Sequence, residues 1–130
     1  MDRISNMLTT IKNAIRAEKP FIEVVYTAHA EKILKVIQDK GFIKSVKVFK
    51  PEGSAFKKLR IDFEYDGTMA LLDDIKIISK PGRRVYKSAD ELRRVSAGYG
   101  VQIVSTSRGV MSSEDAKKKK LGGEVICEVR

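Results

Sequence analysis

Hydrophobic residues recur at helical spacing in two stretches near the start of the chain. The first series, at intervals of three and four residues, is Ile4, Met7, Leu8, Ile11 and Ile15. This spacing gives a helix one apolar stripe, and Asp2 is placed to cap its start. A similar periodicity predicts a second helix over residues 28–40, which ends before Gly41 because glycine readily takes the left-handed conformation of a helix end.

Three stretches in the first half have the composition of β-strands. Residues 21–26 and 43–49 are rich in β-branched and aromatic side chains, and residues 59–65 alternate apolar and charged side chains. The alternation predicts one buried and one solvent-exposed face. We therefore expect residues 1–66 to form an N-terminal lobe with the order α-β-α-β-β.

The second half of the chain has shorter segments and more strands. Strands are predicted over residues 75–79, 83–87 and 124–129, and a further apolar strand begins near Gly98. Ser88 and Glu91 have the spacing of a capping box, which predicts a helix from residue 88 to about residue 97. Another short helix is predicted from Ser112. Residues 67–130 are thus expected to form a β-rich lobe with short helices, and the whole chain an α+β protein of two small lobes.

The charge balance indicates an anionic partner. The chain has 26 basic and 17 acidic residues, a net charge of +9 and an isoelectric point near 9.7. Nucleic acid, a membrane surface and an acidic protein all fit such a charge. No apolar run approaches the roughly 18 residues of a membrane span, and no secretory signal is visible. The single cysteine, Cys127, fits a reducing compartment and a place in the core, so we expect a cytoplasmic protein.

The most informative segment is a run of hydroxyl residues where the strand from Gly98 should turn. We call residues 105–109 the hydroxyl corner; they are Ser105, Thr106, Ser107, Arg108 and Gly109. Hydroxyls both donate and accept hydrogen bonds, arginine pairs with phosphate in a fork, and glycine lets a partner approach the backbone. Such groups suit the shallow, ribose-lined minor groove of RNA better than duplex DNA. The alternative is a polar turn between two strands.

Two other clusters carry concentrated positive charge. Residues 80–87 contain four basic residues and Tyr86, and in an extended segment Arg84 and Tyr86 share one face while Lys87 lies on the other. Arginine and tyrosine together could hold a phosphate and a stacked base, although a charged edge strand is the alternative. The second cluster, Lys117 to Lys120, is compatible with a solvated helix end, a phosphate contact or a membrane-facing patch.

Signs of catalysis and of metal binding are weak. Serine and threonine hydroxyls catalyse only beside a positioned base, and the single histidine, His29, begins the second predicted helix in the other lobe. Histidine, cysteine and acidic residues lack metal-ligand spacing, and Asp73-Asp74 beside Lys76 is typical of a solvated face. We therefore expect no catalytic residue, no metal and no cofactor.

Several motifs together resemble a known family. The first helix, residues 80–87, residues 98–111 and the segment 121–127 (Leu-Gly-Gly-Glu-Val-Ile-Cys) are similar in order and spacing to bacterial-type ribosomal protein S8 of the small subunit. The resemblance implies a primary binder of small-subunit ribosomal RNA. It would recognise a bulged stem in the central domain of that RNA and support subunit assembly. In bacteria the family also commonly binds its own messenger RNA to repress translation.

The resemblance also implies roles for single residues. Ser105, Thr106, Ser107 and Gly109 would contact unpaired bases and backbone of the bulge. Tyr86 would pack on a ribose or base, with Gly122, Gly123 and Glu124 beside it. The first lobe would add backbone contacts through Lys12, Asn13 and Arg16, and neighbouring ribosomal proteins would touch its outer faces. The chain departs from the family in lacking an aromatic residue after Cys127.

Overall fold

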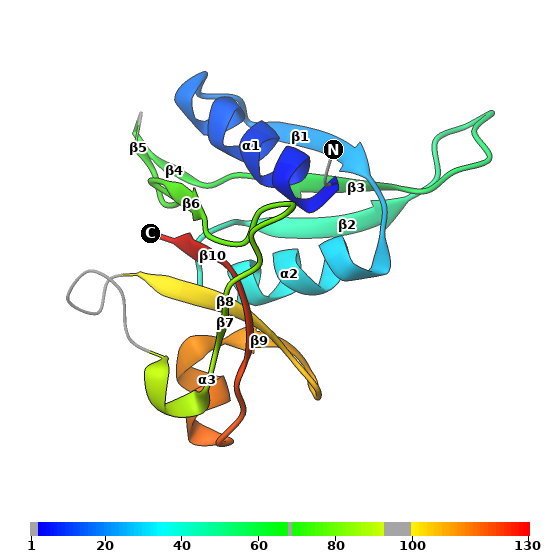
Figure 1. Cartoon of the computed structure of the whole chain (residues 1–130). Helices are drawn as coiled ribbons and strands as arrows, with labels where there is room; N and C mark the ends of the chain where they lie inside the picture. Colours follow the sequence, from blue (N-terminus) through cyan, green and yellow to red (C-terminus); the bar gives the residue numbers. More distant parts are fainter. Residues whose placement is uncertain (1–2, 68, 93–99) are drawn as a thin grey trace.

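The first lobe consists of two helices and a three-stranded antiparallel sheet. The computed structural model describes residues 3–67, 69–92 and 100–130. The elements of this lobe, in chain order, are α1 (Arg3–Arg16), β1 (Phe21–Val25), α2 (Ala28–Asp39), β2 (Ser45–Phe49) and β3 (Lys58–Asp62). The strands lie in the order β1-β3-β2 (Figure 1). The predicted order α-β-α-β-β is confirmed.

Local sequence explains where α2 begins and ends. The side chain of Thr27 accepts a hydrogen bond from the backbone N–H of Ala30 at 3.0 Å, which satisfies one of the unpaired donors at a helix start. At the other end Gly41 has φ +84°, the left-handed conformation expected from the sequence. The predicted cap of α1 at Asp2 lies outside the described residues.

The second lobe is built around a larger antiparallel sheet. Along the chain, the three-stranded sheet is followed by a small hairpin of β4 (Tyr65–Asp66) and β5 (Met69–Ala70). The remaining elements are β6 (Ile75–Ile77), β7 (Tyr86–Lys87), the 3₁₀ turn η1 (Ala89–Glu91), β8 (Val101–Thr106), β9 (Gly109–Ser112), α3 (Ser113–Lys118) and β10 (Gly123–Val129). The order is β6-β10-β8-β9, and β7 also pairs with β10. The α+β class with two lobes is confirmed.

Several predicted strands are shorter than expected: the one predicted over 21–26 ends at Val25, and the one predicted over 43–49 begins at Ser45. The strand predicted over 59–65 ends at Asp62, and the strand predicted over 75–79 ends at Ile77. The second ends there because the N–H groups of Ile78 and Ser79 both donate to one carbonyl, that of Ile126, at 3.0 and 3.2 Å, so the regular ladder stops. In residues 83–87 only Tyr86–Lys87 forms a strand.

In the described residues 88–92, the helix predicted from residue 88 is a single 3₁₀ turn. A carboxylate oxygen of Glu91 accepts a hydrogen bond from the N–H of Ser88 at 2.9 Å, as in a capping box, and a second one from the Ser88 hydroxyl at 3.0 Å. These bonds lower the pKa of Glu91 below its ordinary value. The helix ends at Glu91 because Leu92 is already extended, with φ −71° and ψ 135°. The rest of the predicted helix lies outside the described residues.

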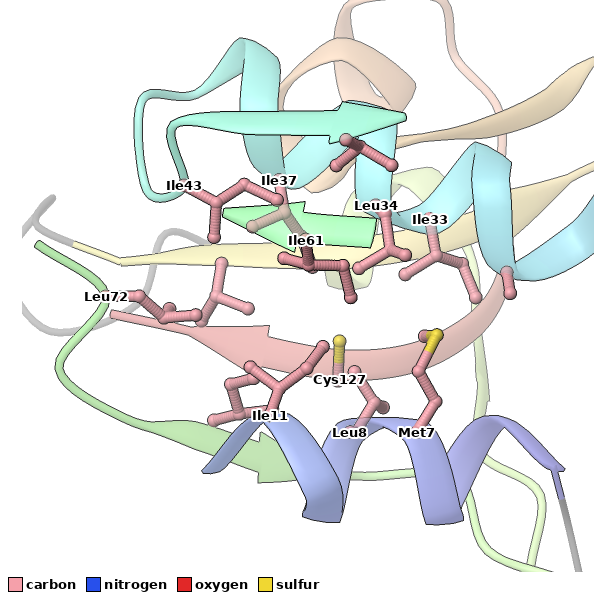
Figure 2. Close-up of a cluster of buried hydrophobic side chains, with 14 of the residues drawn as sticks. Met7, Leu8, Ile11, Ile33, Leu34, Ile37, Ile43, Ile61, Leu72 and Cys127 are labelled. Atoms are coloured by element: carbon pink, nitrogen blue, oxygen red, sulfur yellow. The ribbon is translucent and has the colours of Figure 1, made fainter. Parts of the chain in front are cut away.

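One hydrophobic core joins both lobes. Strand β10 passes between α1 and α2, and Cys127 lies among side chains of both helices (Figure 2). Leu8 of α1, Leu34 of α2 and Ile61 of β3 are each at most 1% exposed. The second lobe adds Ile75, Ile103, Cys127 and Val129 to the same cluster. The division into segments 1–66 and 67–130 therefore stays a prediction about the chain, while the core belongs to both segments.

A second, smaller hydrophobic cluster lies between the second sheet and α3. It consists of Leu92, Val104, Met111, Ala116 and Val125. Ala116 of α3 contributes to it, and Ser112 caps this helix by accepting a hydrogen bond from the N–H of Asp115 at 3.2 Å. The short helix predicted from Ser112 is thus confirmed, with Glu114 and Asp115 in its first turn and Lys117 and Lys118 in its last.

Because the Cys127 thiol is buried, we predict that the protein loses stability at alkaline pH. Burial, with a smaller effect of Glu128, raises the pKa of Cys127 from its ordinary 9.0 to about 12. Between these values the unfolded chain loses the thiol proton and the folded chain keeps it, so the free energy of unfolding falls as pH rises. Relative to about pH 8, this loss should reach about 2 kcal/mol near pH 10.5.

Urea unfolding at both pH values measures this loss. Cys127→Ala is the control, because it removes the thiol and leaves the lysines and tyrosines that titrate in the same range. Its unfolding free energy should fall less steeply with pH. Equal slopes in the two proteins would contradict a buried, neutral thiol.

Candidate nucleic-acid interface

The hydroxyl corner is the end of the β8–β9 hairpin. Thr106 pairs with Gly109 across the hairpin, so Ser107 and Arg108 form its two-residue turn, and both are exposed. Gly109 has φ +118°, and a Cβ there would meet nothing within 4 Å. Ser105 and Thr106 lie within β8, so the strand continues further into the corner than the sequence indicated.

The hydroxyl of Thr106 is used within the turn itself. It donates to the carbonyl oxygen of Gly109 at 2.8 Å and accepts from the N–H of Arg108 at 3.1 Å. A hydroxyl has one proton to donate, so this one is already committed to the turn. Thr106 therefore positions the corner, whereas Ser107 and Arg108 are exposed at its tip.

Strand register places the predicted site residues in two adjacent rows. Because β10 pairs with β8 on one side and β7 on the other, Glu124 lies opposite both Ser105 and Tyr86. In the next row Gly123 lies opposite Thr106 and Lys87. Directly opposed residues in antiparallel strands project their side chains to the same face. We call Ser105, Glu124 and Tyr86 the polar row; the Tyr86 side of it is open, since that residue is 69% exposed.

Arg84 joins the polar row through an ion pair. Its Nη1 lies 3.5 Å from Oε2 of Glu124, with the two side chains 42% and 24% exposed. At this exposure the pair contributes little stability, but it restricts where the guanidinium points. Arg84 and Glu124 also line a hollow of about 380 Å³ between α1 and the second sheet. His29, exposed at the start of α2, lines the same hollow.

Ser79 is a positioning residue that sequence reasoning missed. It is 4% exposed, and its hydroxyl donates to the carbonyl of Val125 at 2.7 Å while accepting from the N–H of Val85 at 3.1 Å. The N–H of Val125 also donates to the carbonyl of Val85 at 2.9 Å. These bonds hold the segment with Arg84 and Tyr86 against β10. A lone serine before Lys80 carries no sequence signal of this role.

Gly122 and Gly123 have steric reasons to be glycine. A Cβ on Gly123 would overlap the carbonyl oxygen of Ser105, and one on Gly122 would lie 2.5 Å from the carbonyl oxygen of Lys87. Both obstacles are backbone atoms, which cannot move aside cheaply. The two glycines therefore let β10 approach its neighbours closely enough to bring Glu124 beside the hydroxyl corner.

Within residues 3–67, 69–92 and 100–130, no three histidine, cysteine or acidic side chains gather as metal ligands would. In these same ranges no helix has the length and apolar character needed to span a bilayer.

Comparison with known proteins decides the family. Residues 2–130 match the family described as Ribosomal protein S8. The chain belongs to the ribosomal protein S8 family. It is similar to "Small ribosomal subunit protein uS8" of Rhodopirellula baltica, with 40% identity covering 98% of this chain and 97% of the relative. The proteins of the same name from Syntrophus aciditrophicus and Trichodesmium erythraeum are each 42% identical, covering 98% of this chain and 96% of each relative.

Membership of the ribosomal protein S8 family confirms two expectations from the sequence. The chain is a ribosomal structural protein, and it is not an enzyme. Where an aromatic residue was expected from the family pattern, the chain has Glu128 and Val129. Val129 is fully buried in the shared core, and Glu128 accepts a hydrogen bond from Arg130 at 3.1 Å.

The residues predicted as secondary contacts do not lie with the hydroxyl corner. Lys12 forms an ion pair with Asp74 at 3.4 Å, which ties α1 to the segment before β6. Asn13 and Arg16 are exposed in the last turns of α1, and this end of the helix lies across the molecule from the β8–β9 turn (Figure 1).

The lysines 117–120 are exposed at the end of α3. Lys117 donates to the carbonyl oxygen of Leu92 at 3.2 Å, so it ties α3 to the segment after η1.

The variant Ser79→Ala tests whether the Ser79 hydroxyl holds the segment with Arg84 and Tyr86 against β10. Ser79→Ala leaves the carbonyl of Val125 and the N–H of Val85 without their hydroxyl partner in a buried place, so the free energy of unfolding should fall by about 1–3 kcal/mol. Ser54→Ala is the matched control, because the Ser54 hydroxyl also makes two backbone hydrogen bonds, both in an exposed loop. Urea denaturation of both variants should show the larger loss for Ser79→Ala. Equal losses would contradict the role assigned to Ser79.

Proposed function

We propose that this protein is a structural component of the small ribosomal subunit that binds a bulged stem in the central domain of the subunit's RNA. Family membership supports the coarser part: a ribosomal protein of the small subunit, working in the cytoplasm with ribosomal RNA and neighbouring ribosomal proteins as partners. The finer part, the kind of RNA and the residues that hold it, rests on the geometry of the polar row and the hydroxyl corner.

The observation that carries the proposal is the register of β10. It sets Ser105, Glu124 and Tyr86 side by side, next to a turn that exposes Ser107 and Arg108. Duplex RNA shows ribose hydroxyls and phosphates along a shallow groove, and a bulge adds unpaired bases that can stack and be read on their edges. A surface with hydroxyls, a carboxylate, a guanidinium and an exposed ring matches each of these groups.

Each residue then has a distinct role. Ser105 and Ser107 hydrogen-bond ribose hydroxyls and base edges, and Gly109 admits the RNA backbone, since nothing lies within 4 Å of its Cβ position. Tyr86 packs its ring on a base or ribose. Arg84, Arg108 and Lys87 hold phosphates, while Glu124 orients Arg84 and accepts a hydrogen bond from the RNA.

Support of subunit assembly is part of the same proposal. RNA that fits it is stabilised in the bulged shape, because binding energy is gained only when that shape is adopted. Any RNA with the same bulged stem would bind the same surface. Repression of translation through the protein's own messenger RNA is part of this proposal, and so are weaker backbone contacts through Lys12, Asn13 and Arg16.

Affinity for a bulged RNA stem tests the proposed site. Tyr86→Ala removes the exposed ring without disturbing the core, and binding should weaken by about 1–3 kcal/mol, as expected for the loss of one stacked base. Ser107→Ala should weaken binding by about 1 kcal/mol. Fluorescence anisotropy with a bulged stem, and with a fully paired stem as competitor, measures both. Lys76→Ala, in the exposed part of β6, is the control and should bind like the parent protein.

Thr106→Val tests the positioning role separately. It keeps the side-chain shape but removes the hydroxyl that holds Gly109 and Arg108, so the turn should loosen and bulged-stem affinity should fall by about 1–3 kcal/mol. Hydrogen exchange of the Arg108 amide should accelerate in the free protein, whereas Ser107→Ala should leave it unchanged. Unchanged affinity in Tyr86→Ala, Ser107→Ala and Thr106→Val, with the fold intact, would overturn the proposed site.

A further inference from the structure

The sheet of the first lobe has one covered and one open face. Ile22, Val46, Leu59 and Ile61 pack in the core with α1 and α2. Side chains alternate along strands, so their neighbours project to the opposite face. The opposite face carries Phe21, Glu23 and Val25 of β1, Ser45, Lys47 and Phe49 of β2, and Lys58, Arg60 and Asp62 of β3. Two of its apolar side chains are well exposed, Val25 at 63% and Phe21 at 39%.

Arg60 is held flat on this open face. The Asp62 carboxylate lies 3.3 Å from both Nε and Nη2 of Arg60, and it accepts a hydrogen bond from the Ser45 hydroxyl at 2.9 Å. The guanidinium carbon of Arg60 lies 3.9 Å from the centroid of the Phe21 ring. One face of the guanidinium thus rests on the ring, and the side chain remains 42% exposed. A guanidinium plane held in this way can stack a nucleobase on its other face.

The hairpin between β2 and β3 adds an exposed aromatic ring. Figure 1 shows residues 50–57 reaching away from the rest of the chain. Phe56 in this loop is 77% exposed. Its backbone is nevertheless fixed: the Ser54 hydroxyl accepts from the N–H of Phe56 at 3.1 Å and donates to its carbonyl at 3.2 Å. The folded chain therefore keeps a large apolar ring in water on a turn held by two hydrogen bonds, where an aromatic partner could stack on it.

Positive charge is concentrated in the hairpin between β2 and β3, whereas the acidic residues Asp62 and Glu23 lie opposite Phe21 and Arg60. Residues 47–58 contain four lysines and one glutamate, a net charge of +3. Register places Lys58 opposite Phe49 and Lys47 opposite Arg60. Lysines interleaved with aromatic rings match a chain of phosphates and flat bases, because each base has a π-face for stacking. An acidic protein would pair with the lysines but offer no flat rings for Phe56 and Arg60, so unpaired RNA is favoured.

We propose that the hairpin platform, which we define as Lys47, Phe49, Phe56, Lys58 and Arg60, is a second RNA-binding surface that takes an unpaired RNA segment. A base stacks on Phe56, another stacks on Arg60, and the two lysines hold the intervening phosphates. The platform goes beyond the bulged-stem site and lies in a different part of the molecule from the β8–β9 turn (Figure 1). The protein would therefore bridge two RNA segments.

Binding of a fluorescent adenosine–cytidine repeat of about ten nucleotides, an unstructured single strand, tests the platform. The full-length protein is titrated with a saturating amount of unlabelled bulged stem present, so that the hydroxyl corner is occupied. Phe56→Ala should weaken binding of the single strand about tenfold, as loss of one stacked base predicts, and Phe56→Trp should preserve it. Leu71→Ala is the matched control, because Leu71 is an exposed apolar residue, at 44%, outside the platform.

The lysines are tested by the salt dependence of the same binding. Lys47→Ala and Lys58→Ala should each reduce the slope of log affinity against log salt by about 0.7, the value for one phosphate contact in a single strand. Lys76→Ala should leave the slope unchanged. Circular dichroism confirms the fold of each variant, and bulged-stem affinity should be unaltered in all of them.

The outcomes separate the platform from the bulged-stem site. Loss of single-strand binding in Phe56→Ala with normal bulged-stem binding supports the platform, even if the hydroxyl-corner variants behave unexpectedly. Displacement of the single strand by the bulged stem would overturn the platform, because one site would then serve both RNAs. Equal binding by the parent, Phe56→Ala and both lysine variants would overturn it as well, as would binding of an acidic peptide in preference to the single strand.

Discussion

Backbone pairing of β10 with its neighbours is the interaction on which both the core and the proposed RNA-binding surface depend. The C-terminal part of the strand buries Cys127 and Val129 between the helices, and its N-terminal part places Glu124 opposite Ser105 and Tyr86. The register shifts between Val125 and Cys127, so that Val125 faces the cluster under α3 while Cys127 faces the shared core. Because the C-terminal half of β10 is packed in the hydrophobic core, the position of Glu124 in its N-terminal half is fixed as well.

Much of this arrangement could be predicted from local sequence. Hydrophobic periodicity predicts the helices α1 and α2, and Thr27 and Gly41 predict the ends of α2. These features can be recognised in the sequence because each depends on residues within one or two helical turns of one another. The hydroxyl corner was recognisable from composition, and the motifs around it indicated the ribosomal protein S8 family, which the comparison confirms. Which residues bind RNA stays a prediction.

The rest depends on contacts between residues distant in the chain. Ser79 holds Val85 and Val125 together, and Gly123 makes room for Ser105, yet neither role is visible without the register of β10. The strand predicted over 75–79 is shortened at the same register shift, because two N–H groups converge on the carbonyl of Ile126. The structure adds a positioning role for Thr106, whose hydroxyl donates to Gly109 and accepts from Arg108 within the turn, while its predicted contact with RNA stays a prediction.

The central claim is that the register of β10 assembles one continuous RNA-facing surface from three separate segments. The most direct measurement is a backbone amide NMR titration of the isotopically labelled protein with a bulged RNA stem. The account predicts that the largest shift changes fall together in residues 84–87, 105–109 and 122–124, and that they saturate with a single affinity. Changes confined to one of these segments, or concentrated in α1 or at Lys117 to Lys120 instead, would contradict it.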